Sequence, residues 1–213
     1  MERKHRGVFC IEAMAPKEDF SCEQTLRFLS ESSNFPFIFR GAVESRAKLV
    51  KYLKEWSSRK DWKYPILYLS AHGSHREISI NDPRGVGFDM MDLRTISRVV
   101  ADHNYNMEGA LVHFGTCSTL DIDPAEVQKF FRDSGVTAIS GYNRDVSWVE
   151  SLAFELLYLC SLQRVMAISE ENDGGISVEL MIEIQERLFD SRKCRGLIDA
   201  LGFNLFRFDE FCE

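Results

Sequence analysis

A histidine and a cysteine that could act together in catalysis stand at the ends of two apolar segments. Residues 65–75 read PILYLSAHGSH, an apolar run suited to a buried strand, which ends at His72 and Gly73, where we expect the chain to turn. Residues 110–119 read ALVHFGTCST, a second such run, which ends at Cys117. Roughly 45 residues separate the two side chains, enough for a crossover between parallel neighbouring strands. Both are therefore expected at the edge where open α/β sheets place their chemistry.

The chemistry that suits this pair is nucleophilic attack by a thiolate. A free cysteine is mostly protonated at neutral pH and needs a base, and imidazole can take the proton and later deliver it to a leaving group. We expect Cys117 to be the nucleophile and His72 the base. Gly73 and Gly115 allow a close approach of the backbone to a substrate. The N–H groups of Gly73 and Cys117 are candidates for an oxyanion hole.

Two alternatives stand beside this interpretation. A lone cysteine or histidine near a strand end is more often a packing or hydrogen-bonded residue than a catalytic one. In addition, His75 could replace His72 as the base, or join it as a metal ligand beside Cys117. The sequence has neither an HExxH nor an HxE…CxxC motif, so we expect no metal and no cofactor. His113 is expected inside its strand, facing a helix layer.

The elements that must position this pair alternate between strand and helix patterns. Strands are predicted at residues 7–12, 36–43, 64–70, 110–117 and 136–140, with an edge strand at 202–208 and a β-hairpin over 77–89 around Asn81-Asp82-Pro83-Arg84-Gly85. Helices are predicted at 23–32, 44–56, 91–102, 123–135, 148–162 and 177–189. Asp123 and Pro124 form a helix start and Gly135 a helix end. This order predicts an α/β fold, a three-layer α/β/α sandwich with a mainly parallel sheet.

Length and composition indicate how many domains the chain forms and which classes of partner it binds. The 213 residues, 45% of them hydrophobic, are enough for one domain, which we expect to span residues 1–213. The net charge is −7, from 33 acidic and 26 basic residues, and no long run of Lys or Arg occurs. We therefore expect neither nucleic acid nor a membrane as a partner.

The cysteines and the apolar segments indicate the compartment. Six cysteines without a CxxC pair predict neither a disulfide framework nor a zinc ribbon. Cys10 and Cys160 are expected in the core, whereas Cys22, Cys194 and Cys212 could be exposed. The N-terminal apolar run GVFCI is too short for a signal peptide, and the apolar window 146–168 contains three charged residues that a membrane helix would rarely tolerate. A cytoplasmic protein is expected.

Four segments together resemble a known family. LYLSAHG, ISINDPRGVGF, DLRTISRVV and LVHFGTCST follow one another as the histidine strand, hairpin, helix and cysteine strand of the caspase-like (clan CD) cysteine peptidases. The chain looks most like their CHAT and separase-type branch, and the resemblance covers residues 7–162. In caspases the histidine also precedes the cysteine, by ~50 residues. GTCST replaces the caspase QACxG signature, so a preference for aspartate is not implied.

The resemblance implies a caspase-haemoglobinase-like fold and a cysteine endopeptidase with His72 and Cys117 as its dyad and Gly73 helping to bind the oxyanion. The loop after the fifth strand would line the substrate pocket, through Gly141, Tyr142, Asp145 and Trp148. The implied partners are a protein substrate and a regulatory protein, in a bacterial defence or cell-death system. The alternative is a catalytically inactive caspase-like module that binds a partner or a small ligand at the same sheet edge.

Overall fold

The computed structural model describes residues 6–13, 21–59, 63–81, 88–101, 107–168, 175–189 and 192–212. The strands are β1 (Val8–Ala13), β2 (Phe37–Arg40), β3 (Ile66–Ser74), β4 (Glu77–Asn81), β5 (Phe88–Asp92), β6 (Leu111–Gly115), β7 (Ala138–Tyr142) and β8 (Phe203–Arg207). The helices are α1 (Glu23–Ser33), α2 (Arg46–Ser57), α3 (Leu93–Ala101), α4 (Pro124–Ser134), α5 (Trp148–Ile168), α6 (Val178–Phe189), α7 (Arg192–Leu201) and α8 (Phe208–Phe211).

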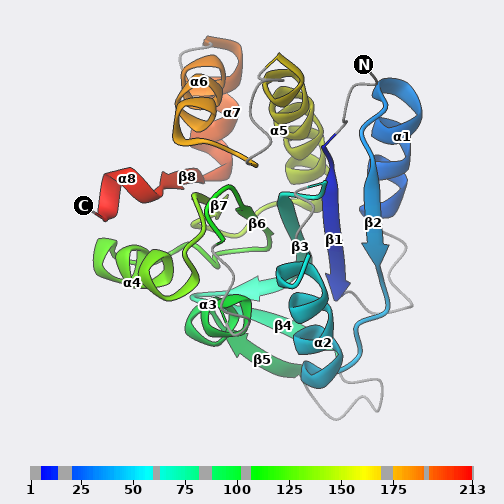
Figure 1. Ribbon diagram of the computed structural model, residues 1–213, viewed down its shortest axis with the longest axis vertical. Coiled ribbons are helices and arrows are strands. Elements are labelled where there is room, and N and C mark those ends of the chain that lie inside the picture. Colours follow the sequence, from blue (N-terminus) through cyan, green and yellow to red (C-terminus); the bar gives the residue numbers. More distant parts are fainter. Residues whose placement is uncertain are drawn as a thin grey trace.

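Six strands form a central sheet in the order β2-β1-β3-β6-β7-β8 (Figure 1). Neighbours in it are parallel except β8, which runs antiparallel to β7. The far end of β3 pairs with β4, and β4 pairs with β5, both antiparallel. The predicted α/β fold with a mainly parallel sheet and a small hairpin after the histidine strand is confirmed.

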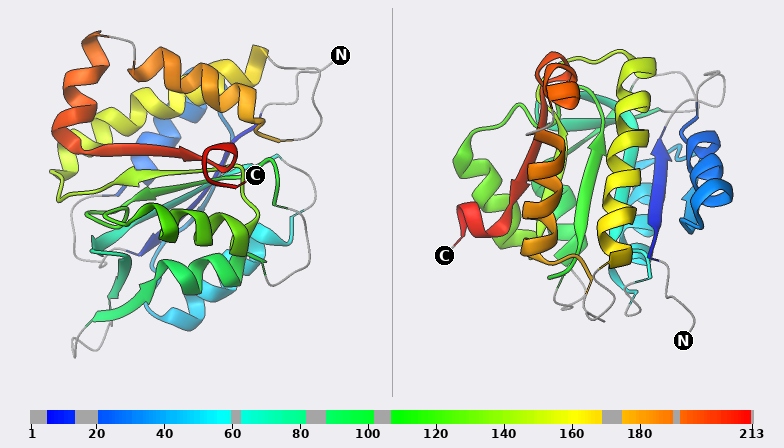
Figure 2. Two further views of the ribbon diagram at one scale, coloured as in Figure 1. Left: turned by 90° about the vertical axis from the view of Figure 1, so that its left-hand side faces the viewer. Right: turned by 90° about the horizontal axis from the view of Figure 1, so that it is seen from above.

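Helices cover both faces of the sheet (Figure 2). Because successive strand side chains point to opposite faces, each strand feeds two cores. In β1, Val8 and Cys10 belong to the core that also contains residues of α1, α5, α6 and α7, whereas Phe9 and Ile11 belong to the core that contains residues of α2, α3 and α4. A parallel strand buried on both faces is apolar at nearly every position, which explains the continuous apolar runs in the sequence.

β3 differs from its prediction at the histidine. The chain does not turn at His72 and Gly73, as expected, but stays extended to Ser74. The reason is β4, which pairs antiparallel with three further residues of β3 and places His72 opposite Ser79. The turn falls at His75 and Arg76, three residues later than predicted, and Arg76 has a φ of 68°.

The C-terminal part contains two helices that were not predicted. α7 carries Gly196 in its interior, and its sequence, RKCRGLIDAL, combines a poor helix former with a short apolar pattern. α8 has only four residues. The expected edge strand is present as β8, and both ends of α4 are as predicted, with a capping box at Asp123 and a left-handed Gly135. The turn of the predicted hairpin, from Asp82 onward, lies outside the described residues.

Within the described ranges, no helix is both long enough and apolar enough to cross a membrane.

Candidate functional site

His72 lies on β3 just beyond the part of the strand that pairs with β6. The register between the two strands matches Ser70 with Gly115. His72 is therefore two residues past this last matched pair on β3, and Cys117 is two residues past it on β6. The His72 side chain is exposed. The predicted placement of both residues at one sheet edge agrees with this register.

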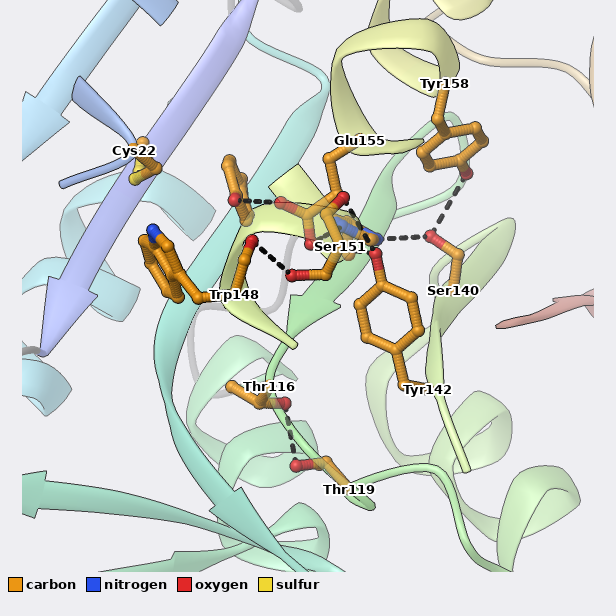
Figure 3. Close-up of polar contacts among 12 residues, drawn as sticks. Cys22, Thr116, Thr119, Ser140, Tyr142, Trp148, Ser151, Glu155 and Tyr158 are labelled. Carbon is orange, nitrogen blue, oxygen red and sulfur yellow. Dashed lines mark hydrogen bonds and ion pairs between the residues drawn. The ribbon is translucent and has the colours of Figure 1, made fainter. Parts of the chain in front are cut away.

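Cys117 lies in a tight turn that follows β6. The Thr116 hydroxyl donates to the Thr119 hydroxyl at 2.7 Å, and Figure 3 shows these two side chains facing each other. The Thr119 hydroxyl in turn lies 3.2 Å from the carbonyl oxygens of both Cys117 and Glu77. Ser118 has a φ of 52°, a left-handed conformation uncommon for a residue other than glycine. The turn is thus fixed to β4 and presents the half-buried Cys117 side chain at the sheet edge.

Gly73 packs against this turn. A β-carbon on residue 73 would lie 2.4 Å from the carbonyl oxygen of Cys117, 2.6 Å from Thr119 Oγ1 and 2.9 Å from Thr116 Cβ. Such contacts are closer than real side chains make, so only glycine fits here. The segment that carries His72 and the turn that carries Cys117 are therefore in direct contact.

The pairing of β3 with β4 fixes where the Gly73 N–H points. Ser74 and Glu77 close a two-residue turn, so they form a hydrogen-bonded pair, and antiparallel pairs then alternate. The next pair, Gly73 and Ile78, is consequently not hydrogen-bonded. The Gly73 N–H therefore points away from β4.

The loop between β7 and α5 contacts the thiol. The Val146 N–H donates to Cys117 Sγ at 3.4 Å, and Sγ lies 3.6 Å from the Val146 carbonyl oxygen. The Ser118 N–H donates to the Arg144 carbonyl at 3.0 Å, and its hydroxyl donates to Asp145 Oδ1 at 2.6 Å. The loop that was predicted to line the pocket therefore lies beside Cys117.

The four predicted pocket residues divide into two groups. Asp145 is exposed, and Trp148, at the start of α5, is partly exposed. Gly141 and Tyr142, in contrast, are buried within β7, which ends two residues later than predicted because β8 pairs with both of them. The Tyr142 side chain is fully buried and faces α5 (Figure 3). The prediction that Gly141 and Tyr142 bind substrate is not supported by their burial.

The alternative histidine, His75, has a different environment. Its Nδ1 lies 2.9 Å from Asp121 Oδ2, and both side chains are more than half exposed. A carboxylate in this position orients an imidazole, so His75 links the β3–β4 turn to the segment after Cys117. In the part of the chain that the structure describes, no three His, Cys, Asp or Glu side chains are arranged to hold a metal ion.

A buried polar cluster on the α5 side of the sheet was missed by sequence reasoning. Glu155 of α5 accepts a hydrogen bond from Tyr68 Oη at 2.5 Å. It accepts another from Tyr142 Oη at 3.1 Å (Figure 3). His113 Nε2 lies 3.3 Å from Glu155 Oε1, without the geometry of a hydrogen bond. The position of His113 facing a helix layer agrees with the prediction. The only sequence signal was Glu155 itself, an acid between apolar neighbours in α5.

The tyrosine hydroxyls in this cluster stay protonated. Burial raises the pKa of Tyr68 and Tyr142 well above the usual value, and the nearby Glu155 carboxylate raises both further. Burial also raises the pKa of Tyr158, whose hydroxyl donates to Ser140 Oγ at 3.0 Å. Each tyrosine is thus held as a hydrogen-bond donor.

The order and directions of the strands define a caspase-like α/β fold. A solved structure of this kind is the Drosophila initiator caspase Dronc, which aligns with a TM-score of 0.51 and 13% sequence identity, over 97% of this chain and 81% of that chain. At this identity the likeness concerns the fold alone.

By sequence, residues 5–207 match the family described as "Family of unknown function (DUF6642)", and the chain belongs to that family. A comparison with curated proteins gave no match. The more specific CHAT or separase-type branch stays a prediction.

Proposed function

We propose that the protein is a cysteine endopeptidase with Cys117 as nucleophile and His72 as base. The observation that carries the proposal is the contact between Gly73 and the Cys117 carbonyl, because it joins the two segments that bear the dyad. The caspase-like fold supports it, since this sheet edge is where open α/β sheets carry their sites.

The proposed reaction has two stages. The Cys117 thiol gives its proton to His72, and the sulfur attacks the carbonyl carbon of a peptide bond. The oxyanion that forms would accept hydrogen bonds from the N–H groups of Gly73 and Cys117. Among the backbone hydrogen bonds of the described residues, the Cys117 N–H donates to no carbonyl. The amine then leaves with the proton from His72, and water hydrolyses the thioester.

The substrate would be a protein, bound along the loop that contacts Cys117. Asp145 and Trp148 are the predicted pocket residues of this loop with exposed surface. A regulatory protein partner, a cytoplasmic location, membership of the CHAT or separase-type branch and a role in bacterial defence or cell death rest on the sequence alone.

One observation favours a second candidate, an inactive caspase-like module that binds a partner. The backbone N–H and carbonyl of Val146 both contact Cys117 Sγ, so the thiol is occupied by the protein's own loop. A peptidase would have to displace this loop when it binds a substrate, whereas a binding module would not.

Cleavage of a mixed peptide library, read by mass spectrometry, separates the two candidates. We expect cleavage by the wild-type chain, loss of cleavage in Cys117→Ala and retention in Cys212→Ala. Cys212 is the matched control because its half-buried thiol also contacts a backbone carbonyl, that of Gln128 at 3.8 Å. No cleavage by the wild-type chain would argue for the binding module, and cleavage that persists in Cys117→Ala would contradict Cys117 as the nucleophile.

A further inference from the structure

Helix α5 carries a carboxylate into the interior of the protein. Glu155 is 3% exposed, and the helix around it is strongly apolar, with sequence neighbours such as Phe154 and Leu156. Removing a carboxylate from water costs several kcal/mol unless hydrogen bonds or charges compensate it. Leucine at this position would avoid that cost, so the carboxylate calls for an explanation other than packing.

The partners of Glu155 come from three different strands. Tyr68 belongs to β3, His113 to β6 and Tyr142 to β7, and their polar atoms lie 2.5, 3.3 and 3.1 Å from the carboxylate oxygens. One side chain thus connects three adjacent strands from the helix layer above them. No apolar residue could set the spacing of three strands through directed contacts of this kind.

Each of these partners stands four positions before a residue of the candidate site. Tyr68 precedes His72, His113 precedes Cys117, and Tyr142 precedes Val146, whose backbone contacts the thiol. In an extended strand, positions four apart share a face, so Tyr68 and His72 lie on the same side of β3. The carboxylate therefore contacts each of the three segments four residues before the residue that lies at the candidate site.

The same carboxylate packs beneath the end of β6. A β-carbon on Gly115 would lie 3.0 Å from Glu155 Oε1 and 2.5 Å from Tyr68 Cε2. Gly115 is the last residue of β6, two positions before Cys117. The cluster thus reaches the site itself, and a displacement of Glu155 would be transmitted to the turn that carries the thiol.

We propose that Glu155 is a positioning residue that holds β3, β6 and β7 at the spacing that His72 and Cys117 need to act as a pair. This inference rests on the proposed function. In Glu155→Gln the side chain keeps its shape, but its amide nitrogen cannot accept a hydrogen bond from a tyrosine hydroxyl. One of the two tyrosines then loses its carboxylate acceptor, and the connection between α5 and the strand that carries this tyrosine is weakened.

The test is a double-mutant cycle between Glu155→Gln and His72→Ala. The rate of alkylation of Cys117 by iodoacetamide in the native protein is measured at neutral pH for the wild type, both single variants and the double variant. We expect Glu155→Gln to slow alkylation about tenfold in the wild-type background and to have no effect once His72 is absent. A loss of general stability would instead change the rate equally in both backgrounds.

Ser134→Ala is the matched control, because it removes a buried hydroxyl whose partner is the Phe130 carbonyl of its own helix, α4, in the core on the other face of the sheet. It should leave the alkylation rate unchanged. Tyr142→Phe removes one donor to the carboxylate while keeping the ring. It should slow alkylation of Cys117 when His72 is present and have no effect in the His72→Ala background. This variant takes the place of Glu155→Gln if Glu155→Gln does not fold.

Three results would overturn the inference. One is an unchanged rate in a folded Glu155→Gln, and another is a slowing that persists in the His72→Ala background. In both of these cases His72→Ala alone would still slow alkylation, and the dyad would stand. If His72→Ala leaves the wild-type rate unchanged, the dyad itself fails and the positioning role fails with it.

Discussion

Gly73 lies so close to Cys117 that a β-carbon on residue 73 would come within 2.4 Å of the Cys117 carbonyl oxygen. This places the residue after His72 directly against the backbone of the proposed nucleophile. The contact involves backbone atoms on the Cys117 side, which cannot rotate out of the way as a flexible side chain would. The spacing of the two segments therefore depends on the absence of a side chain at position 73.

We predict that Gly73→Ala destabilises the protein by about 1–3 kcal/mol, because the added methyl group overpacks a closely packed contact. Gly196→Ala is the matched control. A β-carbon there meets no atom within 4 Å, and alanine in a helix is favoured over glycine by about 0.5–1 kcal/mol. Urea unfolding measures both, and a Gly73→Ala protein as stable as the wild type would contradict the contact.

The N-cap of α4 gives a second prediction. The Asp123 side chain accepts a hydrogen bond from the Glu126 N–H at 3.0 Å, and the Glu126 side chain completes a capping box. Asp123→Ala should lower the free energy of unfolding by about 1 kcal/mol, whereas Asp123→Asn, which keeps the acceptor, should lose a few tenths. Equal losses in urea unfolding would show that the cap does not stabilise the helix.

Local patterns in the sequence were sufficient to predict most of the sheet and the arrival of the segments that carry His72 and Cys117 at one sheet edge. Two apolar runs that each end in a reactive residue determine which strands are buried, and the parallel register then brings their ends together. The sequence could not show that β3 stays extended through His72, because that depends on pairing with β4 rather than on the residues themselves.

The polar cluster could not be predicted for a related reason. Tyr68 and Glu155 are 87 residues apart in the chain, and no local pattern marks such a pair. Tyr142 was expected in the substrate pocket because strand β7 was predicted to end before it. Pairing with β8 extends the strand and buries Tyr142. Each of these errors concerns a long-range contact that a single sequence does not display.

The buried tyrosines make stability fall at high pH. Burial raises the pKa of Tyr68, Tyr142 and Tyr158 in the folded protein, whereas the unfolded chain loses these protons near pH 10. Above pH 10 the unfolded state therefore binds fewer protons than the folded state, and the free energy of unfolding decreases as pH rises, by up to about 1.4 kcal/mol per pH unit for each tyrosine.

Urea unfolding between pH 9 and pH 11 checks this slope. Tyr68→Phe should remove the contribution of one tyrosine to this pH dependence, so the free energy of unfolding of the variant should decline less steeply than that of the wild type. Tyr52→Phe, at a half-buried position on α2, serves as the control and should keep the wild-type slope. If Tyr68→Phe and the wild type decline in parallel, Tyr68 does not titrate as its burial requires.

Burial of the cysteines predicts which thiols resist modification. Cys10 and Cys22 are fully buried with their sulfur atoms 3.4 Å apart, and burial raises the pKa of both. The sequence-based expectation of a buried Cys160 was wrong, since Cys160 is exposed on α5, and Cys22, which could have been exposed, is buried.

We expect iodoacetamide to modify Cys10 and Cys22 on the order of 100-fold more slowly than Cys160 in the native protein, because a buried thiol must wait for local opening. Peptide mapping by mass spectrometry measures each site. Unfolding in urea should remove the difference, and rapid native modification of Cys22 would contradict its burial.

The central claim is that His72 activates Cys117, and the alkylation rate of Cys117 at pH 7 in single histidine variants tests it most directly. His75→Ala is the matched control, because His75 lies three residues further on, is exposed and pairs with Asp121. We predict that His72→Ala slows the reaction at Cys117 about tenfold or more, since the thiol loses its base, and that His75→Ala leaves it unchanged. Equal rates in the wild type and His72→Ala would contradict the dyad, and slowing in His75→Ala alone would identify His75 as the base.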